Sequence, residues 1–199
     1  MSLLVVFPDT DPGAPLEKTR SEAHIAAVLA GIGVRFERWE ASAPLGASAG
    51  QDEVLAAYRA DVDRLMREGG YRSADVVRLA PAPEDPAWPD RARAARQKFL
   101  EEHTHAEDEV RFFVEGAGVF YLRAAGKVHA MLCDKGALLS VPAGTRHWFD
   151  MGKTPYFTAI RLFTTPDGWQ AAFTGDAIAR RFPDYDALAG GGAVIREAP

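Results

Sequence analysis

The chain has 199 residues, of which 47% are hydrophobic, and its formal net charge is −5. This length can bury one sizeable core, and the acidic balance argues against a nucleic-acid partner. No apolar run approaches the length of a transmembrane helix, so no membrane association is expected. The single cysteine, Cys133, excludes an internal disulfide and is expected to be a small buried strand residue. With no signal-peptide pattern at the start, these features predict a cytoplasmic protein, and the mild charge favours a monomer.

The first eighty residues alternate between strand and helix patterns. Short apolar runs bounded by Pro, Gly and Asp are typical of strands, and apolar residues three and four apart are typical of helices. Strands are expected at residues 3–7, 34–39 and 75–79, and helices at 21–29 and 53–67.

The second half of the chain is rich in strands. A proline-rich connection at 81–89 leads to an expected helix over 90–100 with an arginine-rich outer face. Short apolar strands separated by glycine-containing turns then predict a barrel core from about 102 to 163. These strands are expected at 116–122, 127–132, 137–141 and 156–163. At least one short helix is expected within 165–186, and residues 189–199 are expected to form a flexible tail. The pattern predicts an α+β, mainly β, single domain over 1–188, with flanking helices.

A cluster of potential metal ligands begins at His103 and ends with a distant histidine. His103, His105 and Glu109 follow the spacing His-x-His-x-x-x-Glu, and His147 follows a Pro-x-Gly turn. Residues two apart in a strand share a face, so His103 and His105 are expected to point the same way. Three imidazoles and one carboxylate suit a divalent transition metal and leave coordination positions open. Structural zinc sites are usually closed and rich in cysteine, so the pattern favours chemistry on a bound small molecule.

The same periodicity adds two candidate residues to the site. Glu109 opens a β-rich run, and Arg111 falls on the same face of that strand. His147 and Phe149 share a face in the same way. Arg111 and Phe149 are therefore expected to line the cavity beside the ligands.

Other polar residues nearby have simpler interpretations. Glu107 and Asp108 are expected in a solvated turn, and Asp108 is a candidate to orient a ligand histidine from behind. His24 and His129 have no acidic or histidine partner at ligand spacing, so they are interpreted as ordinary surface or core residues.

The two halves of the candidate site resemble the paired motifs of the cupin superfamily, whose metal lies inside a small antiparallel β-barrel, the double-stranded β-helix or jelly roll. The matching positions outside the ligands are Gly116, Gly136, Pro142 and Gly144. Gln97 stands where the family usually has Gly, and Met151 stands where it usually has Asn. Neither position is a ligand, so the site itself is not affected.

Longer segments resemble one branch of that superfamily, the acireductone dioxygenases. The resemblance rests on residues 58–64, 102–113, 114–118, 142–151 and 173–182. It therefore spans most of the chain, and its motif blocks are long and specific.

The resemblance implies an activity in methionine salvage. The substrates would be O₂ and the acireductone 1,2-dihydroxy-3-keto-5-methylthiopentene, an enediol next to a ketone. One Fe(II) or Ni(II) per chain would be held by the four ligands. With iron the family yields 2-keto-4-methylthiobutyrate and formate, and with nickel it yields methylthiobutyrate, formate and carbon monoxide. The sequence does not distinguish the two metals, because occupancy at such a site depends on supply.

The resemblance also implies roles for residues around the metal. Arg111 and Arg161 match positions that orient the substrate or stabilise its charge, for which a guanidinium is suited by its permanent charge and planar donors. Phe99 and Phe149 match positions that shape the pocket, although Phe99 fits helix-to-core packing equally well. For Arg161 strand parity gives no support, because both faces of 156–163 carry apolar residues.

Three alternatives remain open at this point. Another cupin enzyme, such as a flavonol-type dioxygenase or a sugar isomerase, could share the three-histidine, one-glutamate site. A ligand-sensing cupin without turnover is the second, although no basic helix-turn-helix candidate is present. The third is a purely structural metal site, which an exchangeable metal-bound water would argue against.

Overall fold

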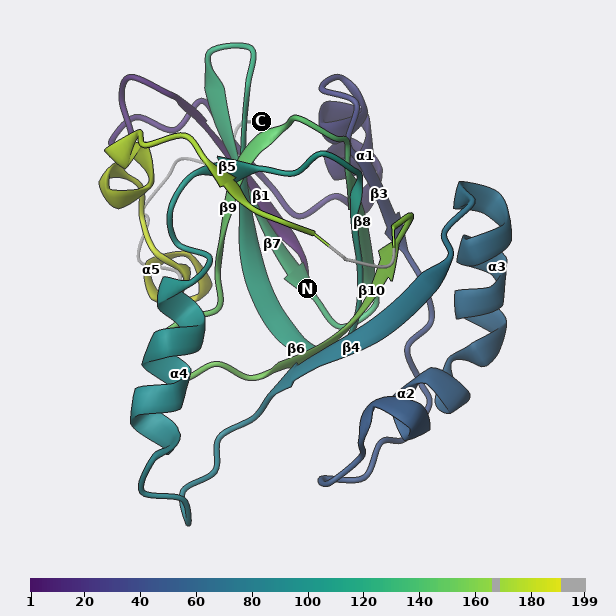
Figure 1. Cartoon of the computed structure of the whole chain (residues 1–199). Coiled ribbons are helices and arrows are strands. Elements are labelled where there is room, and N and C mark those ends of the chain that lie inside the picture. Colours follow the sequence, from purple (N-terminus) through teal and green to yellow (C-terminus); the bar gives the residue numbers. More distant parts are fainter. Residues whose placement is uncertain (166–168, 191–199) are drawn as a thin grey trace.

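Strand β6 (Glu109–Ala124) is shared by two antiparallel sheets that enclose a barrel (Figure 1). The computed structural model describes residues 1–165 and 169–190. The first half of β6 pairs with β8 (Ala137–Val141) and β10 (Phe157–Phe163) in one sheet. Its second half pairs with β7 (Lys127–Asp134) and β9 (Arg146–Asp150) in the other.

The remaining strands extend both sheets outward from this centre. The order in the first sheet is β11-β5-β9-β6-β7-β1-β2, and in the second β10 pairs with β4 and β8 pairs with β3. Their bounds are β1 (Leu3–Pro8), β2 (Glu17–Thr19), β3 (Arg35–Arg38), β4 (Ser73–Leu79), β5 (His103–Thr104) and β11 (Ala172–Phe173). Strands that precede residue 102 thus contribute to both walls of the barrel.

The passage of β6 between the sheets depends on Gly116. This residue has φ +62°, a left-handed conformation that side chains other than glycine rarely adopt. A Cβ built on it would lie 1.9 Å from the carbonyl oxygen of Tyr156. The strand can therefore bend here only because the residue lacks a side chain, which gives the motif glycine a structural reason.

Three apolar clusters hold the layers together. Aromatic residues fill the barrel interior between the sheets, including Phe113, Phe120, Phe149 and Phe157. The outer face of the first sheet is covered by the C-terminal 3-10 helix η1 (Ala177–Arg181) and helix α5 (Tyr185–Ala189). The outer face of the second sheet is covered by α2 (Gln51–Ala57) and α3 (Arg59–Gly69). Burial on both faces explains why the strands read as continuous apolar runs.

The helix pattern at 53–67 is two helices rather than the one predicted. Tyr58 separates α2 from α3 with φ −113° and ψ 24°. Its ring packs edge-on against Phe112 with a centroid separation of 5.6 Å, and its hydroxyl donates to the carbonyl of Ala43. Burial of this ring on the sheet therefore decides the break, which helical spacing alone cannot reveal.

The other helices lie close to where they were predicted. Helix α1 (Glu22–Ala30) is capped by Ser21, and α4 (Trp88–Gln97) begins earlier than expected, with a proline in its first turn. The predicted strands at 3–7, 34–39, 75–79 and in the barrel are confirmed. The short strands β2 and β11 were not predicted. Of the predicted tail, residues 191–199 lie outside the described residues. Its first residue, Ala189, is the last residue of α5. Of the helices described here, none is long and apolar enough to cross a bilayer.

Candidate metal centre

The four predicted ligands converge at one end of the barrel. His103 lies on β5, His105 follows it, Glu109 opens β6, and His147 lies on β9. One ligand atom from each lies within 4.8 Å of all the others, and all four side chains are buried. The pairing of His103 with His147 across β5 and β9 brings the distant histidine to the site. The structure therefore assembles the set that sequence spacing indicated.

Each of the three imidazoles is held in place by a backbone carbonyl that lies at hydrogen-bond distance from its Nδ1. Nδ1 of His103 lies 2.7 Å from the carbonyl of Glu101, and Nδ1 of His105 lies 2.9 Å from that of Gln170. Nδ1 of His147 lies 2.8 Å from its carbonyl partner, Thr145. A carbonyl only accepts, so each Nδ1 carries the hydrogen and each Nε2 keeps a lone pair. The three rings thus present the form in which histidine binds a metal.

Glu109 divides its two oxygens between an arginine and the ligand cluster. Oε1 accepts from Nε and Nη2 of Arg111, both at 2.7 Å. Oε2 lies 2.8 Å from Nε2 of His147 and 3.2 Å from Nε2 of His105. Within the described residues, Glu109 Oε2 and His147 Nε2 are buried without a hydrogen-bond partner. Two lone pairs this close are compensated by a proton or a metal ion between them, and three imidazoles around one carboxylate oxygen fit a divalent metal.

The protonation states follow from burial and neighbouring charges. Burial, aided by the nearby His147, lowers the pKa of His103 to about 4. Burial would raise the pKa of Glu109, but Arg111 and His147 hold it well below its ordinary value. Burial lowers the pKa of His105, but the neighbouring carboxylate of Glu109 outweighs burial and raises this pKa. A neutral His103 and an ionised Glu109 are the metal-binding forms, and the raised pKa of His105 means that protons compete with a metal for its Nε2.

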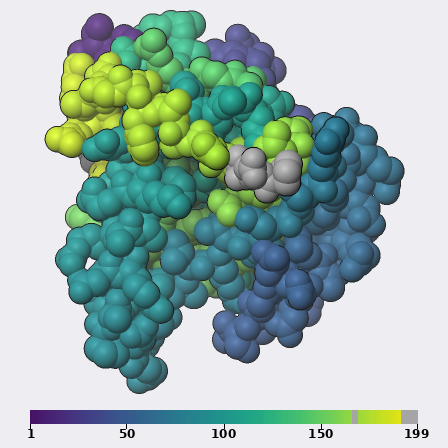
Figure 2. All heavy atoms as spheres, viewed as in Figure 1, coloured from purple at the N-terminus to yellow at the C-terminus, as the bar shows by residue number. Residues whose placement is uncertain are grey.

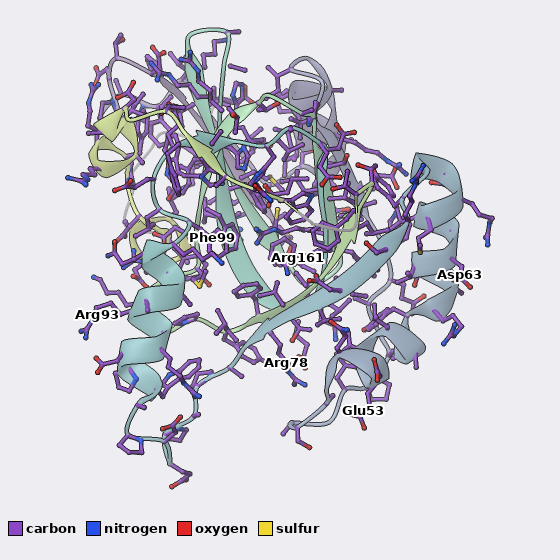
Figure 3. All side chains as sticks on the ribbon, in the orientation of Figure 1. Glu53, Asp63, Arg78, Arg93, Phe99 and Arg161 are labelled. Atoms are coloured by element: carbon purple, nitrogen blue, oxygen red, sulfur yellow. The ribbon has the colours of Figure 1, made fainter. Side chains whose placement is uncertain are left out.

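Arg111 lies deep in the barrel beside the cluster, as strand parity predicted. Its guanidinium carbon lies 4.7 Å from the ring centroid of Phe149, 5.1 Å from that of Phe120 and 5.7 Å from that of Phe99. In Figure 3, Phe99 is seen beside the end of α4. Its carbonyl accepts from the backbone N–H of Phe149, so Phe99 both packs the helix end and faces the arginine.

Arg161, labelled in Figure 3, lies on β10. Its cross-strand partner on β6 is Arg111. The two guanidinium carbons each lie 5.5 Å from the ring centroid of Trp169. The indole N–H of Trp169 donates to the carbonyl of Asp108. Sequence reasoning missed Trp169 and the Gln170 carbonyl, because a lone tryptophan in a polar stretch carries no spacing signal. In Figure 2 the chain after residue 170, drawn in yellow-green, lies over the outside of this end of the barrel.

Two acidic residues have different partners from those expected. The carboxylate of Asp108 accepts from the backbone N–H of Ala143 at 2.9 Å, and no ligand imidazole among the described residues bonds to it. The predicted bond from Asp108 to a ligand histidine is therefore wrong, because backbone carbonyls already occupy all three Nδ1 atoms. Glu107 lies in a bend and is partly exposed, and its carboxylate accepts from the backbone N–H groups and hydroxyls of Thr164 and Thr165.

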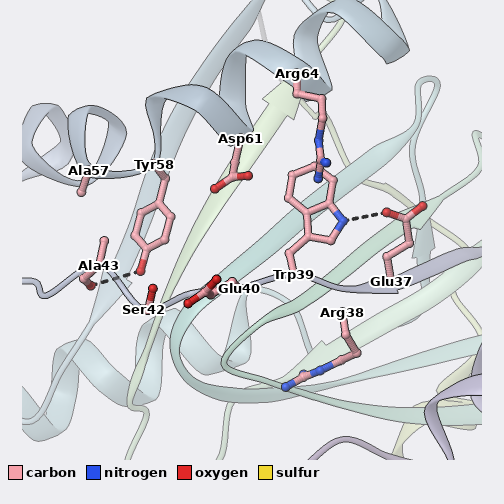
Figure 4. Close-up of a pocket in the computed structure, with 10 residues that line it drawn as sticks. All are labelled: Glu37, Arg38, Trp39, Glu40, Ser42, Ala43, Ala57, Tyr58, Asp61 and Arg64. Carbon is pink, nitrogen blue, oxygen red and sulfur yellow. Dashed lines mark hydrogen bonds between the residues drawn. The ribbon is translucent and has the colours of Figure 1, made fainter.

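A separate hollow of about 580 Å³ lies between β3 and helices α2 and α3 (Figure 4). Its aromatic groups are engaged within the protein. The indole N–H of Trp39 donates to Glu37, and the guanidinium carbon of Arg64 lies 3.6 Å from the centroid of the Trp39 ring. None of its lining residues belongs to the metal cluster. We therefore assign the chemistry to the barrel end.

An antiparallel barrel that holds three histidines and one glutamate inside defines a metal-binding protein of the cupin class. A model of the ARD/ARD' family matches residues 5–171. The chain therefore belongs to this family, the acireductone dioxygenases, and is a dioxygenase. It is 60% identical over 186 residues to the acireductone dioxygenase of Parvibaculum lavamentivorans, which covers 94% of this chain and 98% of that one.

Further relatives agree with this assignment. Acireductone dioxygenase 1 of Nocardia farcinica is 54% identical over 96% of this chain and 100% of its own length. A solved structure of acireductone dioxygenase from Bacillus anthracis superimposes with a TM-score of 0.72 and 26% identity. That comparison covers 87% of this chain and 98% of the other, which carries a cadmium ion in its active centre. The predicted fold class and the family resemblance are thus confirmed.

Proposed function

We propose that this enzyme cleaves 1,2-dihydroxy-3-keto-5-methylthiopentene with O₂ in methionine salvage. With Fe(II) the products would be 2-keto-4-methylthiobutyrate and formate, and with Ni(II) they would be methylthiobutyrate, formate and carbon monoxide. The observation that carries the proposal is the buried, unpartnered pair of Glu109 Oε2 and His147 Nε2 within a three-histidine cluster. The names of close relatives support the same activity.

The metal would be held by His103, His105, Glu109 and His147, one ion per chain. Nitrogen-rich sites with a single carboxylate suit either iron or nickel. A bound ion would supply Lewis-acid chemistry, by holding and orienting the two enediol oxygens of the substrate. The chain itself contributes imidazole rings whose orientation is fixed by backbone carbonyls, so the ligand geometry exists before a metal binds.

The arginines would bind and orient the anionic substrate. Glu109 and Arg111 neutralise each other, so a divalent ion leaves the centre with a net positive charge that attracts an enediolate. Arg161 adds a second guanidinium on the same face of the sheet. Phe99, Phe149 and the neighbouring rings would exclude water and pack against the methylthio tail. In such a dry site each charge acts more strongly than it would in water.

A product assay tests this proposal. Metal-free protein is loaded separately with Fe(II) or Ni(II) and supplied with freshly generated acireductone and O₂, and the acids in solution and the gas above it are analysed. We expect keto acid and formate with iron, and carbon monoxide with nickel. Substrate loss no faster than in the metal-free control, in protein shown to contain metal, would refute the activity.

We propose that the enzyme acts as a monomer in the cytoplasm on small-molecule substrates alone. Among the described residues, few large hydrophobic side chains are exposed, namely Met1, Leu16, Tyr156 and Phe173. The single thiol, Cys133, is fully buried, which fits a reducing compartment. Sedimentation at several protein concentrations tests the oligomeric state.

A further inference from the structure

Two like charges lie side by side in the wall of the barrel. Arg161 on β10 and Arg111 on β6 are direct cross-strand partners, an arrangement that is normally destabilising. A pair of this kind requires a fixed counter-charge for each guanidinium.

Each guanidinium has such a counter-charge, and in both cases the carboxylate contacts the same two nitrogen atoms. Glu109 accepts from Nε and Nη2 of Arg111. Asp75 accepts from the same two atoms of Arg161, at 2.7 Å from Nε to Oδ1 and 2.5 Å from Nη2 to Oδ2. Asp75 is also the cross-strand partner of Arg161, so Asp75, Arg161 and Arg111 form one row across β4, β10 and β6.

These carboxylate contacts decide which guanidinium nitrogen atoms remain without a hydrogen-bond partner. Among the described residues, neither guanidinium has a further hydrogen-bond acceptor, which leaves Nη1 of each available to a substrate oxygen. A planar guanidinium held along one edge can rotate little, so its opposite edge keeps one direction. Without the Asp75 carboxylate, Arg161 would be free to turn toward solvent, away from the like charge of Arg111.

We propose that Asp75 is a positioning residue that orients Arg161 for the substrate, as Glu109 orients Arg111. The inference rests on the proposed function, because it assigns Arg161 to the substrate. The side chains of Asp75 and Arg161 are 35% and 24% exposed. Ion pairs at this exposure contribute about 0–1 kcal/mol to stability, and a purely structural role would change the thermal stability of the variant without changing its affinity for the substrate. An effect on substrate affinity therefore distinguishes the two roles.

The test measures substrate affinity in Asp75 variants of the metal-loaded enzyme. The variants are Asp75→Asn, Asp75→Ser, Asp75→Glu, Arg161→Ala and the double variant Asp75→Asn with Arg161→Ala. Glu115→Gln is the matched control, because Glu115 on β6 pairs with Arg78 on β4 in the same sheet, with side chains 17% and 18% exposed, but on the other face of the sheet. One readout is kcat and KM with acireductone. The other is the Kd of reductic acid, a cyclic enediol ketone, measured calorimetrically without O₂.

We expect Asp75→Asn to raise KM and the Kd of reductic acid by about tenfold, while kcat stays within about twofold. Asp75→Glu should recover part of the loss. In the Arg161→Ala background, Asp75→Asn should have no further effect, because the residue acts through the arginine. Glu115→Gln should match the wild type in both readouts.

Two results would overturn the inference. One is a KM and a Kd for Asp75→Asn equal to those of Glu115→Gln, and the other is additive effects of Asp75→Asn and Arg161→Ala. If Asp75→Asn lacks a cooperative thermal transition, Asp75→Ser is judged by the same criteria. A wild type that binds reductic acid but does not turn over acireductone contradicts the proposed function instead, and the Kd values still decide the role of Asp75.

Discussion

Replacement of Glu109 by Gln separates the two roles of this carboxylate. The side chains of Glu109 and Arg111 are 2% and 4% exposed and are joined by two contacts of 2.7 Å. The amide of the variant can still accept a hydrogen bond, but it leaves a buried guanidinium without a counter-charge beside Arg161. Removing one partner of a buried pair costs about 3–5 kcal/mol. Domains have about 5–15 kcal/mol of unfolding free energy, so we expect the metal-free variant to lose a large part of its stability.

The same change removes the anionic member of the four proposed metal ligands. Removal of a residue that hydrogen-bonds to a metal ligand lowers metal affinity by about 10- to 100-fold. Removal of the ligand itself should therefore lower metal affinity by more than about 100-fold. Urea unfolding of the metal-free protein measures the first effect, and competition with a chelator for Ni(II) measures the second. Glu115→Gln, which breaks a partly exposed pair with Arg78, should lose only about 1 kcal/mol and keep its metal affinity. A Glu109→Gln variant as stable as this control would refute the argument that the pair compensates a buried charge.

Two further predictions concern Arg111 and Asp150. Arg111→Ala should retain metal, because all four ligands remain, while substrate affinity falls about tenfold or more; unchanged turnover and affinity with metal bound would contradict its role. Asp150 is buried, which would raise its pKa, but two hydrogen bonds from Arg96 and backbone N–H groups lower this pKa below the ordinary value. The stabilisation is complete above about pH 4 and is lost as pH falls through the folded-state pKa. Asp150→Asn should therefore be destabilised at pH 7, and chemical denaturation should show the difference from wild type shrinking below about pH 4, whereas a constant difference would contradict the assignment.

Strand periodicity was enough to predict much of the site. His103 and His105 are two residues apart, as are Glu109 and Arg111, and His147 and Phe149. Alternation along a strand is fixed by local backbone geometry, so these pairs share a face in any sheet that contains them. The type of the main elements was predictable for the same reason, since helical and strand spacing are also local.

Local patterns could not predict what approaches from elsewhere in the chain. The break at Tyr58 depends on a ring buried against Phe112, and the first turn of α4 begins within a proline-rich connection. The approach of Trp169 to both arginines depends on how the chain returns over the barrel after β10. None of these has a fixed spacing from its partner.

The sequence by itself determined the ligand set, the face on which it lies and the family to which the chain belongs. Only the tertiary structure decided how the ligands are held. The carbonyl of Gln170 fixes the His105 ring, and the register of β4, β10 and β6 gives Arg161 its carboxylate, Asp75. Carbonyls belong to every residue and carry no sequence signal, and register is set by closure of the whole barrel around its aromatic core. The chemistry of the ligands is therefore local, while their orientation and counter-charges are properties of the fold.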